Sequence, residues 1–446
     1  MTSGKTALKT VAVLGGSYGG KSDHACNGAA RVLASRLPHN WRVVLIDRNS
    51  HSNHLYVLPR FTVIPDHEHK GFIPYDHLYK PQLTRTDPPV TDSRHLVLQA
   101  TVKALTTRSV DLSRTFPEHG INEGKLDYDF LVYALGSHSP DPINLWTNRG
   151  LGEAVVDGSK PDGIEWLKRA QGRIRDAPSV LIVGGGALGI QYAGDIAEKY
   201  PGKHVTLLHS RPRLLPKYNY AMHTQILAAL HKLGVEVILN ERLVLSSPGA
   251  VSSSTQEQVL KSTAGREISA RLVLLCTGQR PNTELISAAL PECVIPSGPK
   301  AGAVQVTRTL QAAIVDHEED SPESLKVAAP HIFAIGDVAN AFGAIHAGHN
   351  AHAQGLLAAN NILKLVGRME ASHNSVTELM AGAGTDLEEY TPGPPGIKVS
   401  LGLHNAIYQR HGEVGTLTDQ PLDWEAAFMW KAYGFAPDLK EEDMYV

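Results

Sequence analysis

The chain has 446 residues, which at about 150 residues per domain suggests roughly three structural units. Its 42 basic and 45 acidic residues leave a formal net charge of −3, which argues against a nucleic-acid binder, because such proteins carry a basic surplus or stripe. Hydrophobic residues make up 42%, enough for substantial cores, and the three cysteines, Cys26, Cys276 and Cys293, fit neither a disulfide framework nor a CxxC site.

Targeting and membrane signals are lacking in the sequence. No apolar run approaches the roughly 18 residues that a spanning helix needs, and the N-terminal stretch has no apolar core of the kind found in signal peptides. These features predict a cytoplasmic protein and leave contact with a membrane surface open.

The first predicted elements form a strand, a glycine turn, a helix and a second strand. The strands are expected at 11–14 and 42–47 and the helix at about 29–37, an order typical of a βαβ unit with a buried parallel sheet.

The turn of this unit resembles a dinucleotide-binding motif in which Ser17 replaces the middle glycine. Asp47 ends the second strand, where a carboxylate accepts hydrogen bonds from a ribose. Asp47 follows Gly15 at a longer distance than the usual ~20 residues, and the segment Lys21–Gly28, whose role the sequence does not indicate, accounts for the extra length.

A loop-rich stretch then carries five of the 22 histidines: His51, His54, His67, His69 and His77. Their spacing does not match a helical metal-binding motif, so we predict packing or solvated histidines and no metal site.

A second unit repeats the first with a complete glycine motif. An apolar strand at 179–183 leads into Gly184, Gly186 and Gly189, followed by a helix near 191–200 and a strand at 204–208. The GxGxxG spacing permits a tight turn and brings the backbone and the helix N-terminus close to a pyrophosphate.

Three further segments complete the pattern. A strand at 272–275 leads into Gly278, and an apolar strand ends at Gly336-Asp337 before helix-prone Val338-Ala339. After the linker at 391–396 we expect a small C-terminal unit with a strand at 397–402 and a helix at 424–433.

In this order, the motifs resemble the two-dinucleotide-binding-domain flavoproteins of the pyridine nucleotide-disulphide oxidoreductase class. That class includes type II NADH dehydrogenases, apoptosis-inducing factor and the ferroptosis-suppressor quinone reductase. The resemblance is carried by Gly15–Gly20, Asp47–Asn49, Tyr133–Ser137, Gly184–Gly189, Cys276–Asn282 and Gly336-Asp337. Four further segments are most similar to fungal members of the apoptosis-inducing-factor-2 group: His51–Phe61, Lys70–Tyr75, Ile397–Gly402 and Met429–Lys431.

The resemblance implies an α/β fold with two Rossmann-like domains and a small C-terminal α+β unit. An FAD-binding domain would comprise 1–145 and 276–375, an NAD(P)H-binding domain 146–275, and a C-terminal domain 376–446. FAD and NADH or NADPH are the implied cofactors, and Gly136 and Gly278 would lie at crossovers between the lobes. The implied cofactor-binding residues are Gly15, Gly16, Ser17, Tyr18, Gly19, Gly20, Asp47, Arg48, Gly136, Gly184, Gly186, Gly189, Arg211, Gly278 and Asp337.

Three residues are expected to take part in catalysis. His349 shares a helix face with His352 and falls on a family position that borders the flavin, so it is the first candidate for relaying protons. His54 lies in the histidine stretch near the flavin and is the second candidate. Gln191 stands where the family usually has a glutamate, and since an amide cannot carry a proton, we expect it to hydrogen-bond the nicotinamide or a neighbouring backbone group.

The preferred interpretation is an FAD-dependent NAD(P)H oxidoreductase, monomeric or homodimeric, that passes hydride from nicotinamide to flavin and then electrons to a quinone-like or other organic acceptor. No acid follows Leu208, so we predict tolerance of both NADH and NADPH, with Arg211 or Arg213 near the 2′-phosphate. Two alternatives stay open: a tailoring oxidoreductase of secondary metabolism with a dedicated substrate, and an NADH-responsive signalling flavoprotein of the apoptosis-inducing-factor type.

Overall fold

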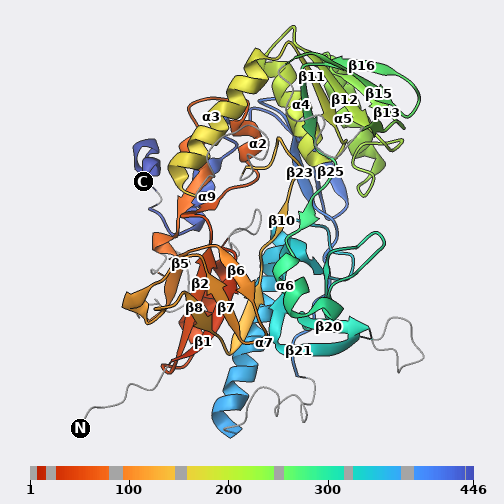
Figure 1. The fold of residues 1–446 in the computed structure, drawn as a ribbon. Coiled ribbons are helices and arrows are strands. Elements are labelled where there is room, and N and C mark those ends of the chain that lie inside the picture. The colour runs from red at the N-terminus through yellow and green to blue at the C-terminus, as the bar shows by residue number, and fades with distance from the viewer. Residues whose placement is uncertain are drawn as a thin grey trace.

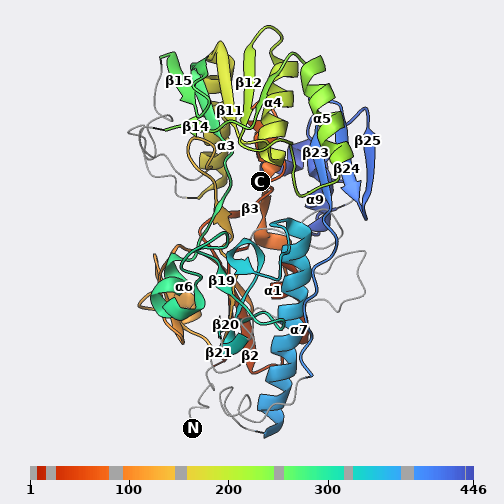
Figure 2. The same ribbon diagram turned by 90° about the vertical axis from the view of Figure 1, so that its right-hand side faces the viewer.

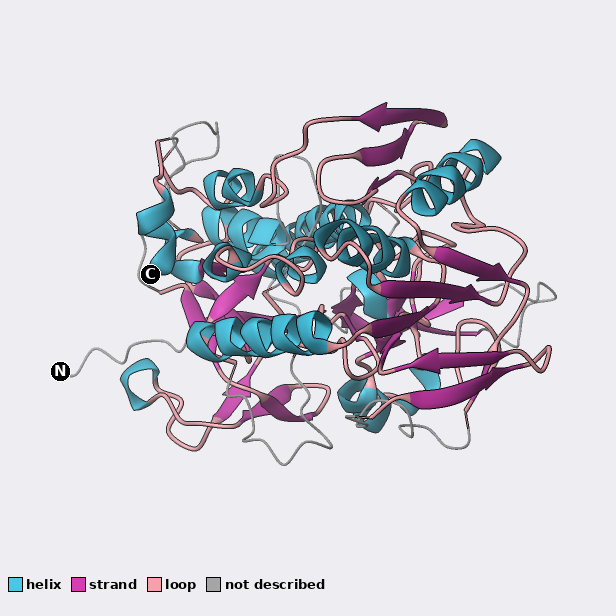
Figure 3. Ribbon diagram, turned by 90° about the horizontal axis from the view of Figure 1, so that it is seen from above, coloured by secondary structure: helices cyan, strands magenta, loops and turns pink. Residues whose placement is uncertain are grey.

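The computed structural model describes residues 8–16, 27–79, 94–145, 158–245, 256–315, 325–372, 386–436 and 438–446. Two lobes lie one above the other, each built on a parallel sheet (Figure 1). Figure 2 shows the long helix α7 (Gly348–Ser372) running along the lower lobe. The helices and strands of both lobes are distinguished by colour in Figure 3.

The lower lobe contains a six-stranded sheet in the order β20-β21-β9-β1-β2-β5, in which only the edge strand β20 runs antiparallel to its neighbour. Its strands are β1 (Lys9–Leu14), β2 (Trp41–Asp47), β5 (Leu96–Gln99), β9 (Phe130–Tyr133), β20 (Gln311–Val315) and β21 (Leu325–Ala334). The central strands are continuous apolar runs because both faces of the sheet are covered. Helix α1 (Asn27–Arg36) packs on β2 and on α7.

The upper lobe contains a four-stranded parallel sheet in the order β13-β12-β11-β17. Its strands are β11 (Ser179–Val183), β12 (His204–His209), β13 (Glu236–Leu239) and β17 (Leu272–Leu275). The helices of this part of the chain are α3 (Lys160–Asp176), α4 (Ala187–Lys199) and α5 (Tyr220–Lys232).

The two lobes repeat one plan. In each, a three-stranded antiparallel sheet comes before the strand that pairs with the first strand of the lobe: β9 pairs with β1 in the lower lobe, and β17 pairs with β11 in the upper lobe. In the lower lobe it consists of β6 (Val102–Leu105), β7 (Ser109–Leu112) and β8 (Lys125–Asp127). In the upper lobe it consists of β14 (Leu243–Val244), β15 (Gln258–Ser262) and β16 (Glu267–Ala270). A residue that follows a strand of the lower lobe can therefore be compared with the residue that follows the corresponding strand of the upper lobe.

The remaining elements join the lobes and cover them. Between the lobes, β10 (Ser137–His138) pairs with β18 (Arg280–Pro281), as Figure 1 shows near the middle of the molecule. The other short elements are α2 (Leu58–Phe61), α6 (Glu284–Ala289), β3 (His51–Asn53), β4 (Phe72–Pro74), β19 (Val304–Gln305) and β22 (Ala339–Asn340). The C-terminal elements are β23 (Ile397–Ser400), β24 (Ala406–Arg410), β25 (Glu413–Leu417) and α9 (Ala426–Ala432).

The predicted α/β fold with Rossmann-like sheets is confirmed, and most predicted elements lie within a few residues of their observed bounds. The helix expected near 191–200 begins earlier, at Ala187, because Gly186 already forms its N-cap. The helix expected at Val338-Ala339 is wrong: a short 3₁₀ turn, Gly336–Val338, is followed by β22. Ser17, Tyr18, Gly19 and Gly20, and most of the segment Lys21–Gly28, lie outside the described residues.

Candidate active site

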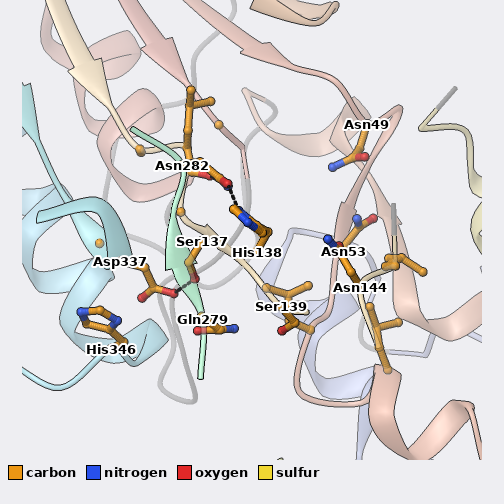
Figure 4. Close-up of a pocket in the computed structure, with 18 of the residues that line it drawn as sticks. Asn49, Asn53, Ser137, His138, Ser139, Asn144, Gln279, Asn282, Asp337 and His346 are labelled. Atoms are coloured by element: carbon orange, nitrogen blue, oxygen red, sulfur yellow. Dashed lines mark hydrogen bonds between the residues drawn. The ribbon is translucent and has the colours of Figure 1, made fainter. Parts of the chain in front are cut away.

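A cavity of about 620 Å³ is lined by residues of both lobes. Asp47, Ser137 and Asp337 line it from the lower lobe, and Ala187 and Gln191 line it from the start of α4. Figure 4 shows Asp337, Ser137 and Gln279 in one part of it and Asn49 and Asn53 in another. A cavity of this volume is in the range of small-molecule and cofactor sites.

The first glycine turn requires glycine at Gly15. Its backbone N–H donates to the Ile46 carbonyl at 2.9 Å, and its φ of 96° lies in the left-handed region. A Cβ at this position would collide with the Ala134 carbonyl oxygen. The turn therefore passes closely between the ends of β2 and β9.

Asp47 is buried directly beneath this turn. Its Oδ2 accepts from the Gly16 N–H at 2.6 Å and from the Tyr75 hydroxyl at 3.1 Å, and its Oδ1 accepts from the Asn49 N–H at 2.7 Å. Burial raises the pKa of Asp47, and these donors oppose that shift. The Asn49 side-chain oxygen, also buried on the cavity, has no hydrogen-bond partner. A carboxylate and a free amide oxygen beside a glycine turn fit the ribose hydroxyls of the ADP part of FAD.

Asp337 follows β21 on the short 3₁₀ turn. Its Oδ2 accepts from the Ser137 hydroxyl at 2.7 Å, and the Gly336 N–H donates to Gln354 Oε1 at 2.7 Å. His346 lies beside Asp337 on the cavity wall (Figure 4). Burial lowers the pKa of His346, while the Asp337 charge raises it. The cavity wall therefore presents the Asp337 carboxylate, which can accept from hydroxyl groups, beside the His346 imidazole.

The two segments between the lobes are held together by Asn282. Its side-chain amide donates to the Leu135 carbonyl at 2.8 Å, and its Oδ1 lies 2.7 Å from His138 Nδ1. Its backbone N–H donates to the Gly136 carbonyl at 2.9 Å. The segments that contain Gly136 and Gly278 are therefore adjacent, as expected for two crossovers.

The second glycine motif stands at the start of α4. Gly184 has a φ of 121°, and a Cβ on Gly189 would collide with the Gly184 carbonyl oxygen. Nothing lies within 4 Å of the position of a Cβ on Gly186, so the helix N-terminus is open there. Backbone N–H groups at an open helix N-terminus fit the pyrophosphate of a dinucleotide.

The structure brings some of the predicted site residues together and separates others. Those that line the cavity are Gly15, Asp47, Arg48, Gly136, Gln191 and Asp337. Gly16 does not line the cavity, but its N–H donates to Asp47, which does. The other predicted residues outside the cavity lining are Gly184, Gly186, Gly189, Arg211 and Gly278. His349 is half-buried in the first turn of α7 and does not line the cavity. His54 does not line it either and is buried beside β3, where burial lowers its pKa to about 3.

Three residues of the site, His346, Ser137 and Tyr75, were not among the predicted site residues. Ser137 ends the motif Tyr133–Ser137, so its position was visible in the sequence. Tyr75 ends the segment Lys70–Tyr75, but nothing in the sequence indicates its contact with Asp47, and His346 carries no local signal, because only the tertiary fold brings it to Asp337.

The described cysteines are not a redox pair. Cys276 and Cys293 are free thiols, and burial raises the pKa of both, that of Cys293 to about 12. Cys26 lies outside the described residues. In the described part of the chain, no three histidine, cysteine or acidic side chains gather in a way that could hold a metal ion.

Comparison with known proteins gives the family. Residues 9–355 match the family model described as pyridine nucleotide-disulphide oxidoreductase. Fe-regulated protein 8 of Mycosarcoma maydis is 42% identical over 437 residues, 96% of each chain. Apoptosis-inducing factor homolog B of Dictyostelium discoideum is 25% identical over 92% of this chain and 90% of its own. The chain belongs to the pyridine nucleotide-disulphide oxidoreductase family.

A solved structure shows the same fold. NDH2 of Plasmodium falciparum, in complex with NADH, matches with a TM-score of 0.62 at 12% identity and covers 95% of this chain and 96% of its own. The match to the family model confirms the expected family and, with it, FAD and NADH or NADPH as cofactors. The chain is an oxidoreductase of this FAD-dependent family. Among the described helices, none combines the length and apolar character that crossing a membrane requires.

Proposed function

We propose that the chain transfers electrons from NADH or NADPH to a quinone-like or other small organic acceptor. The observation that carries this proposal is one cavity whose lining includes Asp47, Asp337 and Gln191, the last on α4. When bound, FAD supplies the hydride and electron chemistry. The protein supplies binding, orientation and protons.

Gln191 orients the nicotinamide in this proposal. Its amide lines the cavity on the first turns of α4, close to the open N-terminus of that helix. An amide donates and accepts hydrogen bonds but does not titrate, so it can hold a carboxamide without transferring a proton.

An organic acceptor suits the apolar part of the cavity wall. Leu55, Tyr56, Leu58, Leu145 and Trp166 line it, and Leu55 and Tyr56 are 48% and 40% exposed. Flat aromatic molecules gain from burial against such side chains. Because the described thiols are protonated and unpaired, a cysteine pair in this part of the chain is not the acceptor.

His346 replaces His349 as the proposed proton donor. Reduction of a quinone consumes two protons, so a titratable group must reach the acceptor. His346 lines the cavity and is solvent-accessible, whereas His349 does not line it. An imidazole both donates and accepts protons near neutral pH.

Other expectations from the sequence remain proposals. The division into an FAD-binding domain (1–145 and 276–375), an NAD(P)H-binding domain (146–275) and a C-terminal domain (376–446) is supported by the two separate parallel sheets. The cytoplasmic location, peripheral membrane contact and the monomeric or homodimeric state also stay predictions.

Steady-state turnover of the FAD-loaded protein tests the proposal. NADH and NADPH are supplied in turn with benzoquinones, naphthoquinones and ferricyanide as acceptors. We expect rapid oxidation of the coenzyme with at least one quinone. A long-lived reduced protein that turns over slowly with every acceptor would contradict the proposal and favour the signalling alternative. Turnover with ferricyanide alone would favour a dedicated substrate.

A further inference from the structure

The two lobes repeat the same turn after their first strands. The Gly15 N–H donates to the Ile46 carbonyl at 2.9 Å, and the Gly184 N–H donates to the Leu208 carbonyl at 2.8 Å. A Cβ on Gly15 would collide with the carbonyl oxygen of Ala134, which follows β9, and a Cβ on Gly184 would collide with that of Cys276, which follows β17. The residues after Ile46 and Leu208, Asp47 and His209, therefore occupy equivalent positions.

Asp47 and His209 make the same contact with the glycine turn. The Gly16 N–H donates to Asp47 Oδ2 at 2.6 Å, and the Gly185 N–H donates to His209 Nδ1 at 3.0 Å. Both side chains are buried, with exposed fractions of 6% and 9%. His209 thus stands where a dinucleotide-binding fold carries the acid that accepts hydrogen bonds from the adenosine ribose.

The histidine at this position differs from an acid in its hydrogen bonding. Since Nδ1 of His209 accepts from Gly185, the proton of the neutral ring resides on Nε2. That buried nitrogen makes no hydrogen bond of ordinary geometry. Unlike Asp47, the position therefore carries no carboxylate that would accept from the ribose 2′-hydroxyl or repel a 2′-phosphate.

Two arginines add positive charge beside His209. The Glu241 N–H donates to the His209 carbonyl at 3.2 Å and the Asn240 N–H to the Arg211 carbonyl at 3.3 Å, so the chain segments that carry Arg211 and Arg242 run side by side. Burial lowers the pKa of His209, the Arg213 carbonyl opposes this, and the charges of Arg211 and Arg242 lower it further. Both arginines are exposed, and neither forms an ion pair with another described residue.

We propose that the upper lobe recognises the 2′-phosphate of NADPH, with Arg211 and Arg242 pairing with the phosphate and His209 replacing the ribose-binding acid. Arg213 is not part of this site, because its guanidinium donates to the Pro216 carbonyl at 2.6 Å. The sequence predicted that both NADH and NADPH are accepted, and we now expect NADPH to be preferred. This inference rests on the proposed function, in which the upper lobe binds NADH or NADPH.

Ligand binding tests the inference without turnover. Adenosine 2′,5′-bisphosphate and adenosine 5′-monophosphate are titrated into the FAD-loaded protein by calorimetry. We expect the bisphosphate to bind at least about tenfold more tightly, because charge-assisted pairs with the 2′-phosphate are present only in that ligand. Equal affinities, or tighter binding of the monophosphate, overturn the inference. Preferred binding of the bisphosphate without any turnover would refute the proposed function and leave this inference intact.

Variants then assign the residues. His209→Asp restores the arrangement of Asp47, so the ratio of kcat/KM for NADPH over NADH should fall by about 100-fold or more. Arg211→Ala and Arg242→Ala should each lower the affinity for the bisphosphate about tenfold and leave that for the monophosphate unchanged. Arg213→Ala is the matched control and should retain the wild-type ratio. An unchanged ratio in the folded arginine variants overturns the assignment, even where His209→Asp fails to fold.

Discussion

Asp337 is held where two segments far apart in the sequence meet. Its carboxylate accepts from Ser137 on the cavity wall, 200 positions earlier in the chain. If Asp337 accepts from the ribitol hydroxyls of FAD, Asp337→Ala should cost about 1.5–3 kcal/mol of FAD binding, because a charged hydrogen-bond acceptor is lost. Flavin fluorescence during serial dilution measures the dissociation constant. The surface variant Asp443→Ala should retain the wild-type value, and full FAD occupancy of a folded Asp337→Ala protein would remove Asp337 from the site.

His346 and His349 lie three positions apart and differ in access to the cavity. If His346 supplies protons, His346→Ala should slow oxidation of the reduced protein by quinone about 10²-fold, and reduction by NADPH should be unchanged. Stopped-flow measurement separates the two half-reactions. His349→Ala is the control and should alter neither rate. The opposite result, with only His349→Ala slow, would restore the residue that the sequence favoured.

Residues recognised from the sequence belong to contiguous motifs. Asp47 ends an apolar strand, and Gly15 and Asp337 closely follow one, so a local pattern locates them. Tyr75 directly follows β4 and reaches Asp47 only because the β3–β4 pair folds back over the lower lobe. No spacing pattern in the sequence indicates this contact. The position of His209 was visible in the sequence, but the role that we propose for it rests on its contact with the Gly185 N–H.

At the scale of elements, the histidine-rich stretch is more ordered than a solvated loop. It forms the β3–β4 pair and α2, and His54 and His69 are buried in it. Its short strands and single-turn helix have no strong periodicity, which is why the sequence indicated only a loop-rich segment. By contrast, the apolar strands β2 and β11 were predicted to within one residue of their bounds, because their burial pattern covers a whole element.

Buried histidines make the stability of this segment depend on pH. Burial lowers the pKa of His54 to about 3, and burial followed by the charge of Lys160 lowers that of His51 to about 4. In the unfolded chain both protonate near ~6.5, so the unfolded state binds more protons below that pH. The stabilisation is complete above pH ~6.5 and is lost as the pH falls towards the folded-state values.

We therefore expect the free energy of unfolding in urea to fall between pH 6.5 and 4.5. His54→Asn removes one titrating group, so its pH dependence should be shallower by about 1.4 kcal/mol per pH unit. His404→Asn, at an exposed position, should retain the wild-type slope. Identical slopes for wild type and His54→Asn would show that another group governs acid unfolding.

At the scale of the whole molecule, the C-terminal strands share the core of the upper lobe. Val399, Leu401 and Ile407 are buried in the same cluster as Ile190 and Ile196 of α4. Figure 2 shows β23, β24 and β25 beside α5 and α4. The predicted C-terminal unit thus packs against the upper lobe, which carries the second glycine motif.

A buried ion pair joins this assembly to the histidine-rich stretch. Arg60 on α2 donates to both carboxylate oxygens of Asp195 on α4, at 2.8 and 3.1 Å, and to the carbonyls of Gly402 and Leu403, each at 2.8 Å. The two side chains are only 3% and 1% exposed. Burial raises the pKa of Asp195 to about 6, with Arg60 opposing the shift, so the pair is charged at pH 7.

This pair links two elements that carry cavity-lining residues: Leu58 and Thr62 lie at α2, and Leu188 and Gln191 lie on α4. Asp195→Ala leaves the Arg60 charge buried without a partner and should lower the free energy of unfolding by about 3–5 kcal/mol. The double variant Arg60→Met/Asp195→Leu removes both charges and keeps the volume, so it should be more stable than the single variant. Glu165→Ala, which breaks the exposed pair with Lys168, should unfold much like the wild type.

Because α4 also carries Gln191, the double variant should show a raised KM for the coenzyme although it is folded. Urea titration and steady-state kinetics on the same preparations measure both effects. If the double variant kept the wild-type KM, the ion pair would contribute to folding alone, and the packing of β23 and β24 on α4 would suffice to place the two walls of the cavity.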